Sequence, residues 1–430
     1  MTWLTAAIFL LLPGIAWTAR KSGGSWYAPA AFFAAFWCVF AGLPLVASPI
    51  GIAPAGMLFV AGACGSILAG AWLAQRWQRI PTGYAPRLEV QQPPLLGWLI
   101  AACTVLGFAV VVLILYSVET SSSALRLLSF DAIVQTIHKL AVARNGGTWE
   151  EPAAARVLTT ATYLGPMLSG VMIGLRNTGS ARWWSLLVFL PSVLITVILT
   201  TKSSLLLPLA LAASAYLATS IANGTAALLT WRRAAWLLGG VAVIAVGFVL
   251  IQMARYAGWA QGRLEVVIPS LWQSVFPYLG VFSMWLQNNG VTASLHPTFG
   301  QYTFAGIFEL LRIHTRVAGL YTDQVVINGS QYNVYTAFRG VVQDFTIPGA
   351  LVFFGLVGFG VQLAYRRVRA GDMAFVGVLA AFYAATLWSF VVDVFIYNTI
   401  VLAFVVLIGY LALGTRVSVG KVAARAVSSP

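Results

Sequence analysis

The segment that decides the fold class is NVYTAFRGVVQDFTIPGALVFFGLVGFG, residues Asn333 to Gly360. Its second half is an apolar run long enough to cross the hydrocarbon core of a bilayer. Its first half places Tyr335, Arg339 and Asp344 directly before that run. Charged residues make up only 8% of the chain, and a charge close to lipid is costly. The pattern therefore indicates a membrane protein with a polar site at one membrane boundary.

Apolar segments of this kind recur along the whole chain. A hydrophobic content of 60% and a mean hydropathy of +0.86 exclude a soluble globular protein. Backbone polar groups in lipid must pair internally, and no alternating pattern suggests a barrel, so the spans are expected to be helical. We predict an all-α polytopic protein, one membrane domain over residues 1–430, with about eleven transmembrane helices. The expected spans are 2–19, 28–47, 54–74, 95–117, 157–175, 183–200, 204–221, 234–253, 347–365, 373–392 and 396–414.

The distribution of cations predicts the orientation. Short loops on one face of the predicted topology collect fifteen of the 25 Lys and Arg residues, and such loops face the cytoplasm. We therefore expect the N-terminus outside and the C-terminus in the cytoplasm. The net charge of +14 follows from this asymmetry and does not call for nucleic acid. The fifteen cations are Arg20, Lys21, Arg76, Arg79, Arg87, Arg176, Arg182, Arg232, Arg233, Arg366, Arg367, Arg369, Arg416, Lys421 and Arg425.

Two long segments are expected on the outer face, at about 118–156 and 254–346. The larger one is rich in aromatic residues, and two of its stretches, 266–289 and 302–321, are apolar enough for amphipathic or re-entrant helices on the membrane surface. Long loops in compact proteins are usually functional. We therefore expect the chemistry in the larger outer loop.

The polar residues before the 347–365 span have two interpretations. If 331–346 is helical, Tyr332, Tyr335 and Arg339 share one face. Such an arginine can bind an anion through two hydrogen bonds and the tyrosines can stack on sugar rings, or both residue types can serve as interfacial anchors. Asp344, just before an apolar helix, can equally be a helix N-cap.

The same stretch resembles the signature of bacterial oligosaccharide repeat-unit polymerases, the O-antigen polymerase family. The match runs through Asn333-Val-Tyr-Thr, Phe338-Arg339 and Asp344-Phe345, and it departs at Thr346, where the family usually has a glycine. TTKSSLLLPLALAA, from Thr200, and TFGQYTFAGIFELLRI, from Thr298, are weaker similarities.

The resemblance implies a glycosyltransferase of the bacterial inner membrane, acting in polysaccharide or lipopolysaccharide biosynthesis. The growing glycan would move from its undecaprenyl diphosphate carrier to the non-reducing end of a new lipid-linked repeat unit at the periplasmic face. The fold implied is that of lipid-sugar glycosyltransferases, with no cofactor and no metal. Besides lipid-linked donor and acceptor, the implied partners are a chain-length regulator and a flippase.

The implied reaction needs cations for the leaving diphosphate and a base for the acceptor hydroxyl. The candidate bases are Asp344, Glu309, His314 and Glu265, with the choice left open. The candidate catalytic residues are Arg339, Asp344, Arg255 and His314, and the candidate substrate-binding residues are Lys202, Arg312, Tyr335, Tyr332 and Asn333.

Two alternatives stay open. An O-antigen ligase of the same superfamily would transfer the glycan to a lipid A core. A polysaccharide flippase or other transporter should show inverted repeats and polar or broken helices at mid-depth, and we find neither in the sequence.

Overall fold

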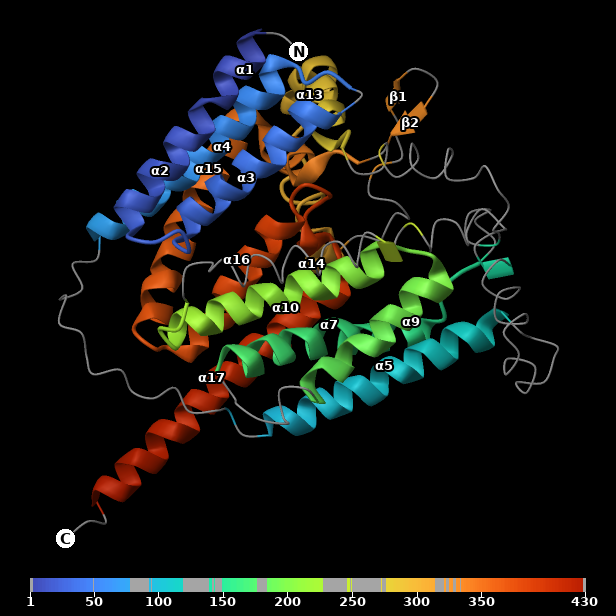
Figure 1. Ribbon diagram of the computed structural model, residues 1–430, viewed down its shortest axis with the longest axis vertical. Coiled ribbons are helices and arrows are strands. Elements are labelled where there is room, and N and C mark those ends of the chain that lie inside the picture. The colour runs from blue at the N-terminus through green and yellow to red at the C-terminus, as the bar shows by residue number, and fades with distance from the viewer. Residues whose placement is uncertain are drawn as a thin grey trace. The chain divides into compact units, whose positions relative to one another are not determined.

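The computed structural model describes residues 3–48, 50–77, 93, 95–118, 139–140, 143, 149–175, 184–226, 246–247, 249, 272, 276–313, 321, 325–327, 330–332 and 334–427. These residues are predominantly helical, as predicted (Figure 1). The chain divides into two compact units. Unit 1 comprises Met1–Gln91 and Trp272–Pro430, and unit 2 comprises Gln92–Leu271.

Unit 1 contains helices from both ends of the chain and a small antiparallel hairpin, in which Val325 pairs with Tyr332. Its elements are α1 (Trp3–Phe9), α2 (Leu11–Gly23), α3 (Pro29–Ala47), α4 (Pro54–Trp77), α13 (Tyr278–Leu295), α14 (Ala305–Leu310), β1 (Val325–Ile327), β2 (Ser330–Tyr332), α15 (Thr336–Arg369), η3 (Met373–Phe375), α16 (Val376–Trp388), η4 (Val394–Ile396) and α17 (Asn398–Val427).

Unit 2 is a smaller helical bundle. Its described elements are α5 (Leu96–Val118), α7 (Ala153–Gly174), the short 3-10 helix η2 (Ser185–Phe189), α9 (Leu190–Leu199) and α10 (Ser203–Ala222). α7 and α10 approach closely because Gly170 has no side chain: a Cβ there would lie 2.2 Å from the carbonyl oxygen of Ala212. Small residues at such crossings are typical of membrane helix pairs.

The helices agree with the expected membrane segments. Seven helical segments in the described part of the chain are long and apolar enough to cross a membrane. Three shorter apolar helices, Ser185–Leu199, Met373–Trp388 and Asn398–Gly414, coincide with three further expected spans. Most of the remaining one, 234–253, lies outside the described residues.

The closest helix pair in unit 1 is α4 with α15. A Cβ on Gly70 of α4 would lie 1.9 Å from the carbonyl oxygen of Gly355, and a Cβ on Gly358 would lie 2.3 Å from that of Ile67. The two helix backbones are therefore in direct van der Waals contact. Such contact stabilises helix pairs in lipid, where the hydrophobic effect contributes little to helix association. This contact sets the position of α15, whose first turns carry the signature residues.

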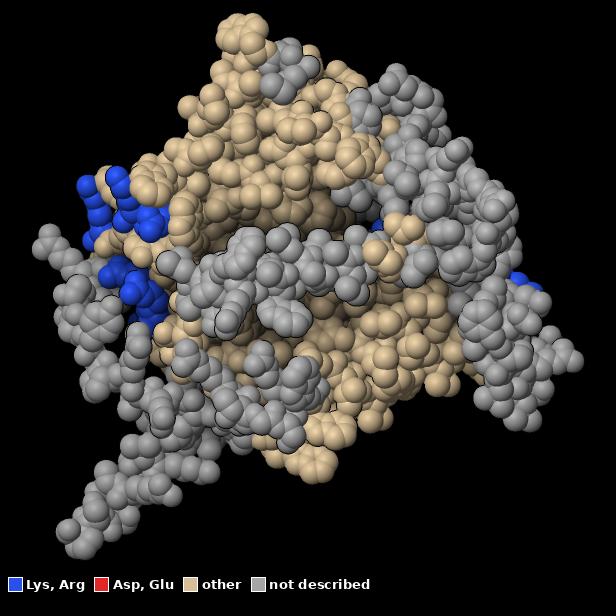
Figure 2. Space-filling view, in the orientation of Figure 1, with Lys and Arg blue, Asp and Glu red and all other residues tan. Residues whose placement is uncertain are grey.

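Cations gather at one end of unit 1. Arg20 and Lys21 lie in the last turn of α2, Arg76 in that of α4, and Arg366 near the end of α15. The Arg366 guanidinium donates to the carbonyl oxygen of Ala74 at 3.3 Å, which ties the ends of α4 and α15 together. In Figure 2 most of the visible Lys and Arg side chains form one group at the left, and a few blue atoms lie elsewhere on the face. We call this group the basic end of unit 1.

The larger expected outer loop is partly built into unit 1. α13, which covers much of the stretch expected to lie on the membrane surface, has Tyr278, Leu279, Val281 and Phe282 buried. Gly280 and Ser283 are buried as well, and the six consecutive positions 278–283 point to every side of the helix, so the expectation of an amphipathic surface helix is wrong for this segment. α13 is a packed helix beside α4 and α15.

Candidate functional site

The signature residues lie on a short, buried helix at the start of α15. Helical backbone stops at Thr346, whose φ of 66° and ψ of 173° break α15 into two helices. We call residues 336–345 the entrance helix. The N–H of Ala337 donates to the carbonyl oxygen of Ser389 at 2.8 Å, which attaches its first turn to the end of α16. The long second part of α15 begins where the sequence predicts the span 347–365 to begin.

Phe338 anchors the entrance helix in the aromatic core of unit 1. Its ring lies 4.6 Å from that of Trp37 on α3 and 5.5 Å from that of Phe59 on α4. Phe282 on α13 lies 5.7 Å from it on another side. Four helices thus meet on one side chain, and burial of rings of this size contributes strongly to core stability. The next residue, Arg339, is therefore carried into a packed environment.

The guanidinium of Arg339 lies among three aromatic rings. Its Cζ atom is 4.0 Å from the ring centroids of Tyr321 and Tyr335 and 4.9 Å from that of Trp285. Arg339 is only 3% exposed, and its Nε donates to Gln343 Oε1 at 3.4 Å. We call Trp285, Tyr321 and Tyr335 the Arg339 cage. A cation on aromatic faces gains about 0.5–2 kcal/mol per contact, so the cage supports a buried positive charge.

A second layer of aromatic residues backs the cage. Tyr302 stacks on Tyr321 with 5.8 Å between ring centroids and 8° between the ring planes. Burial raises the pKa of the Tyr321 hydroxyl above its usual range, although the positive charge of Arg339 opposes this shift. Tyr321 therefore stays neutral and presents a polarised ring to the guanidinium.

Asp344 fixes a turn that is distant in sequence. One carboxylate oxygen accepts from Thr298 Oγ1 at 2.5 Å and from the Tyr302 N–H at 3.1 Å, and the other accepts from the Thr303 N–H at 2.6 Å. Asp344 is fully buried. It does cap backbone N–H groups, but those of the turn before α14 rather than those of its own helix. The turn therefore holds Tyr302 behind the cage.

A second carboxylate lies in the same region of unit 1. Asp393 caps η4 by accepting from the N–H of Phe395 at 3.0 Å. Burial raises its pKa to about 7, the N–H of Phe395 opposes the shift, and the negative charge of Asp344 adds to it. The pKa of Asp393 therefore lies near neutral pH, and this carboxyl group is close enough to Asp344 for the charge of Asp344 to affect it.

The structure brings together part of the predicted set. Tyr335, Arg339 and Asp344 lie together on or beside the entrance helix. Tyr332 lies on β2, so the expectation that it shares a helical face with Arg339 is wrong, because the helix begins at Thr336. The side chain of Arg339 is buried among protein groups rather than exposed to lipid, so its interpretation as an interfacial anchor is not supported.

The other predicted residues lie elsewhere. Arg312 is exposed at the end of α14, with a left-handed φ of 56°. Lys202 directly precedes α10 in unit 2. Arg255, His314 and Asn333 lie outside the described residues.

Sequence reasoning did not single out Trp285, Tyr302 or Tyr321 as partners of Arg339. The aromatic richness of 254–346 was a signal that this segment has a role. It did not identify which rings meet the guanidinium, because those contacts join residues far apart in the chain. Comparison of the chain with protein-family models, with curated proteins and with solved structures gave no match.

Proposed function

We propose that this protein is a membrane glycosyltransferase that polymerises polyprenyl-diphosphate-linked oligosaccharide repeat units. In the proposed orientation, about eleven helices cross the bacterial inner membrane, the N-terminus is outside and the C-terminus is cytoplasmic. The growing glycan leaves its undecaprenyl diphosphate carrier and is joined to the non-reducing end of a new lipid-linked repeat unit at the periplasmic face. The resemblance of 333–345 to the polymerase signature supports this reaction class.

The observation that carries the proposal is the caged cation at the far end of α15 from the basic end of unit 1. Arg339 and Arg366 are separated by at most about 40 Å of helix, which is comparable to the thickness of a bilayer. If the basic end faces the cytoplasm, as short basic loops do, the cage lies at the outer boundary. A lipid-linked sugar diphosphate would present its charged group at that depth.

The chemistry of the leaving group suits arginine. Breaking the bond between the glycan and the diphosphate develops negative charge, and a preorganised cation stabilises it best where water is excluded. A guanidinium binds phosphate oxygens through two parallel hydrogen bonds and stays charged at every working pH. We assign Arg339 to the diphosphate and Tyr335 to the adjoining sugar.

The two carboxylates take different roles in this proposal. Asp344 already receives three hydrogen bonds, so we assign it to positioning the turn that backs the cage. Asp393, with a pKa of about 7, is close to the optimum for accepting a proton from a sugar hydroxyl at neutral pH. We therefore place Asp393 as the general base for the acceptor.

The test is polymer synthesis by the purified full chain in nanodiscs supplied with a defined undecaprenyl-diphosphate-linked repeat unit. Arg339→Lys keeps the positive charge but loses the planar guanidinium, so it cannot bind a diphosphate through two parallel hydrogen bonds. We expect the polymerisation rate to fall about 10²–10³-fold. Arg76→Lys is the matched control, since Arg76 also lies over an aromatic ring, 3.5 Å from that of Trp72, but at the basic end; it should keep the normal rate.

The same experiment separates the alternatives. Polymer made at the normal rate by a folded Arg339→Lys protein would remove Arg339 from the reaction. Transfer of glycan only when a lipid A core is added would identify a ligase. Movement of the lipid-linked repeat across the bilayer without new glycosidic bonds would identify a flippase.

A further inference from the structure

The ends of α2 and α4 carry the same arrangement of residues. On α2, Trp17 precedes Arg20 by three residues and Lys21 by four, and on α4, Trp72 precedes Arg76 by four. Residues three and four apart lie on one face of a helix. Each helix therefore places a tryptophan one turn before a cation, and in both helices the cation lies in the last turn.

The tryptophan rings hold the two guanidinium groups in place. The Arg20 Cζ atom lies 5.0 Å from the ring centroid of Trp17 and 5.3 Å from that of Trp26. The Arg76 Cζ atom lies 3.5 Å from the ring centroid of Trp72. A guanidinium that contacts a ring face still donates hydrogen bonds from its edge. Arg20 and Arg76 are therefore donors whose orientation is set before a ligand binds.

Few acids oppose the charges at this end of unit 1. The last turn of α15 adds Arg367 and Arg369 to Arg366, so the basic end carries six cations. Among the four acids in the described part of unit 1, only Asp372 follows α15 at this end, and it accepts from the Ala374 N–H at 3.1 Å. The excess of positive charge attracts an anion. The other three acids are Glu309 on α14, Asp344 on the entrance helix and Asp393 before η4.

The surface beside these cations is apolar. Trp17 is 49% exposed, Trp72 is 44% exposed and Leu73 is 55% exposed. Trp77, the last residue of α4, is 79% exposed. Exposed tryptophan is typical of the level at which hydrocarbon meets the lipid headgroups. A ligand for this surface therefore needs an anionic group directly beside an apolar one.

The ends of α2 and α4 belong to one surface. The hydroxyl of Thr5 donates to the carbonyl oxygen of Ile52 at 3.1 Å, which joins the starts of the two membrane segments. These segments, Trp3–Gly23 with 21 residues and Pro54–Trp77 with 24, are similar in length, so their ends reach a similar depth. α2 also packs against α4 (Figure 1), and packed helix axes lie about 8–10 Å apart. Side chains from both ends can therefore contact one ligand.

We propose that the ends of α2 and α4 bind an anionic phospholipid. Its phosphate accepts hydrogen bonds from Arg20 and Arg76, and its acyl chains pack on Trp17, Trp72 and Leu73. A free phosphate would use the cations alone, and an acidic protein would bring carboxylates rather than hydrocarbon onto the exposed rings. In the proposed orientation this lipid belongs to the cytoplasmic leaflet, but the site rests on these helix ends and not on glycosyl transfer.

The test is thermal unfolding of the purified full chain in a neutral detergent. Added dioleoylphosphatidylglycerol should raise Tm saturably, and dioleoylphosphatidylcholine at the same concentration should not. A cation near an anionic lipid surface contributes about fivefold to affinity, so Arg20→Gln/Arg76→Gln should weaken the apparent affinity about 25-fold. The Tm shift should also shrink as the NaCl concentration rises, because salt screens exposed charges.

A second variant tests the rings. Trp17→Leu/Trp72→Leu keeps both positive charges but removes the rings that orient them. The apparent affinity for the phosphatidylglycerol should therefore fall about two- to fivefold for each ring removed. A response to net charge alone would leave this variant unchanged.

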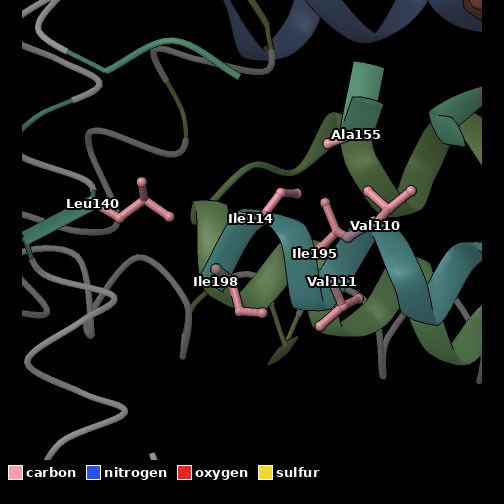
Figure 3. Packing of buried hydrophobic residues seen from close by; sticks show 7 residues of the cluster. All are labelled: Val110, Val111, Ile114, Leu140, Ala155, Ile195 and Ile198. Atoms are coloured by element: carbon pink, nitrogen blue, oxygen red, sulfur yellow. The ribbon is translucent and has the colours of Figure 1, made fainter. Parts of the chain in front are cut away.

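Lys139→Gln/Arg156→Gln is the matched control, because it removes the same number of cations from exposed positions of unit 2. Leu140 and Ala155, their neighbours in the chain, belong to the buried cluster of unit 2 shown in Figure 3. Both control positions therefore lie next to packed residues. The control should keep the full Tm shift with the phosphatidylglycerol.

Several results would overturn the proposal. They are no Tm shift with the phosphatidylglycerol, an equal shift with the phosphatidylcholine, an unchanged affinity in either variant pair, and an equal loss in the control pair. The same shift with sodium glycerol 3-phosphate, which has the phosphate but no acyl chains, would identify a free-phosphate site instead. None of these measurements involves polymer synthesis, so the lipid site and the proposed function can each fail without the other.

Discussion

The carboxylate of Asp344 accepts a hydrogen bond from the backbone N–H of Thr303 at 2.6 Å, across 41 residues of sequence. This contact joins the entrance helix to the turn before α14. Through that turn it places Tyr302 behind Tyr321 and so behind the Arg339 cage. The architecture of the candidate site thus depends on a carboxylate that need not touch substrate.

Asp344→Asn tests this positioning role. The asparagine amide has an NH₂ group where the aspartate has an oxygen, so one backbone N–H would face another donor instead of an acceptor. We therefore expect the free energy of unfolding to fall by about 2–3 kcal/mol. Asp372→Asn is the control, because Asp372 accepts a local bond from the Ala374 N–H at 3.1 Å; its loss should stay under about 1 kcal/mol. Chemical unfolding in detergent measures both, and equal losses would contradict the role of Asp344 as a long-range anchor.

Thr346→Gly should stabilise the protein. A φ of 66° with a ψ of 173° is unfavourable for a β-branched residue by roughly 1–3 kcal/mol, but glycine adopts it freely. Glycine also raises the entropy of the unfolded chain and loses the hydrogen bond that Thr346 Oγ1 accepts from the Gly349 N–H at 3.3 Å. After both costs are counted, we expect a gain of up to about 1 kcal/mol. Thr18→Gly, at an exposed position within α2, should instead lose about 0.5 kcal/mol. A loss of stability in Thr346→Gly would show that the break in α15 is not strained.

Asp393 should make stability depend on pH. Its pKa is raised from about 3.9 in the unfolded chain to about 7 in the folded protein. The folded state therefore binds the proton more tightly, so this contribution is complete below pH 4 and is lost as the pH rises through 7. We expect Tm to fall between pH 5 and pH 8 by less in Asp393→Asn than in the wild type. An identical pH dependence in both proteins would contradict the shifted pKa.

The orientation of unit 1 can be measured with single cysteines. In a background where Cys38 is replaced, we expect Gln301→Cys, beside the turn that Asp344 anchors, to react with an impermeant maleimide in intact cells. Arg369→Cys, at the basic end, should react only after the inner membrane is opened. Both side chains are exposed, so access to the reagent depends on the membrane side. The reverse pattern would place the Arg339 cage in the cytoplasm.

Much of the fold is readable from local sequence. Apolar length alone predicts spans at 28–47, 54–74 and 95–117, where the structure has helices α3, α4 and α5, because a bilayer leaves the backbone few structures that satisfy its polar groups. The break before the 347–365 span is also local, since it coincides with the change from polar to apolar composition. Clusters of arginine likewise mark helix ends, and the structure gathers those of α2, α4 and α15 at one end of unit 1.

Local sequence predicts only part of the candidate site. The sequence by itself places Arg339 and Gln343 on one side of a helix, since their spacing follows helical geometry. Only the tertiary structure decides that this side faces Trp285 and Tyr321 rather than lipid, and that Asp344 binds the turn at Thr303. Those contacts depend on which helices pack together. Packing requires complementary shapes in segments that are far apart in the chain, and the hydrophobic periodicity of one segment does not predict its partner.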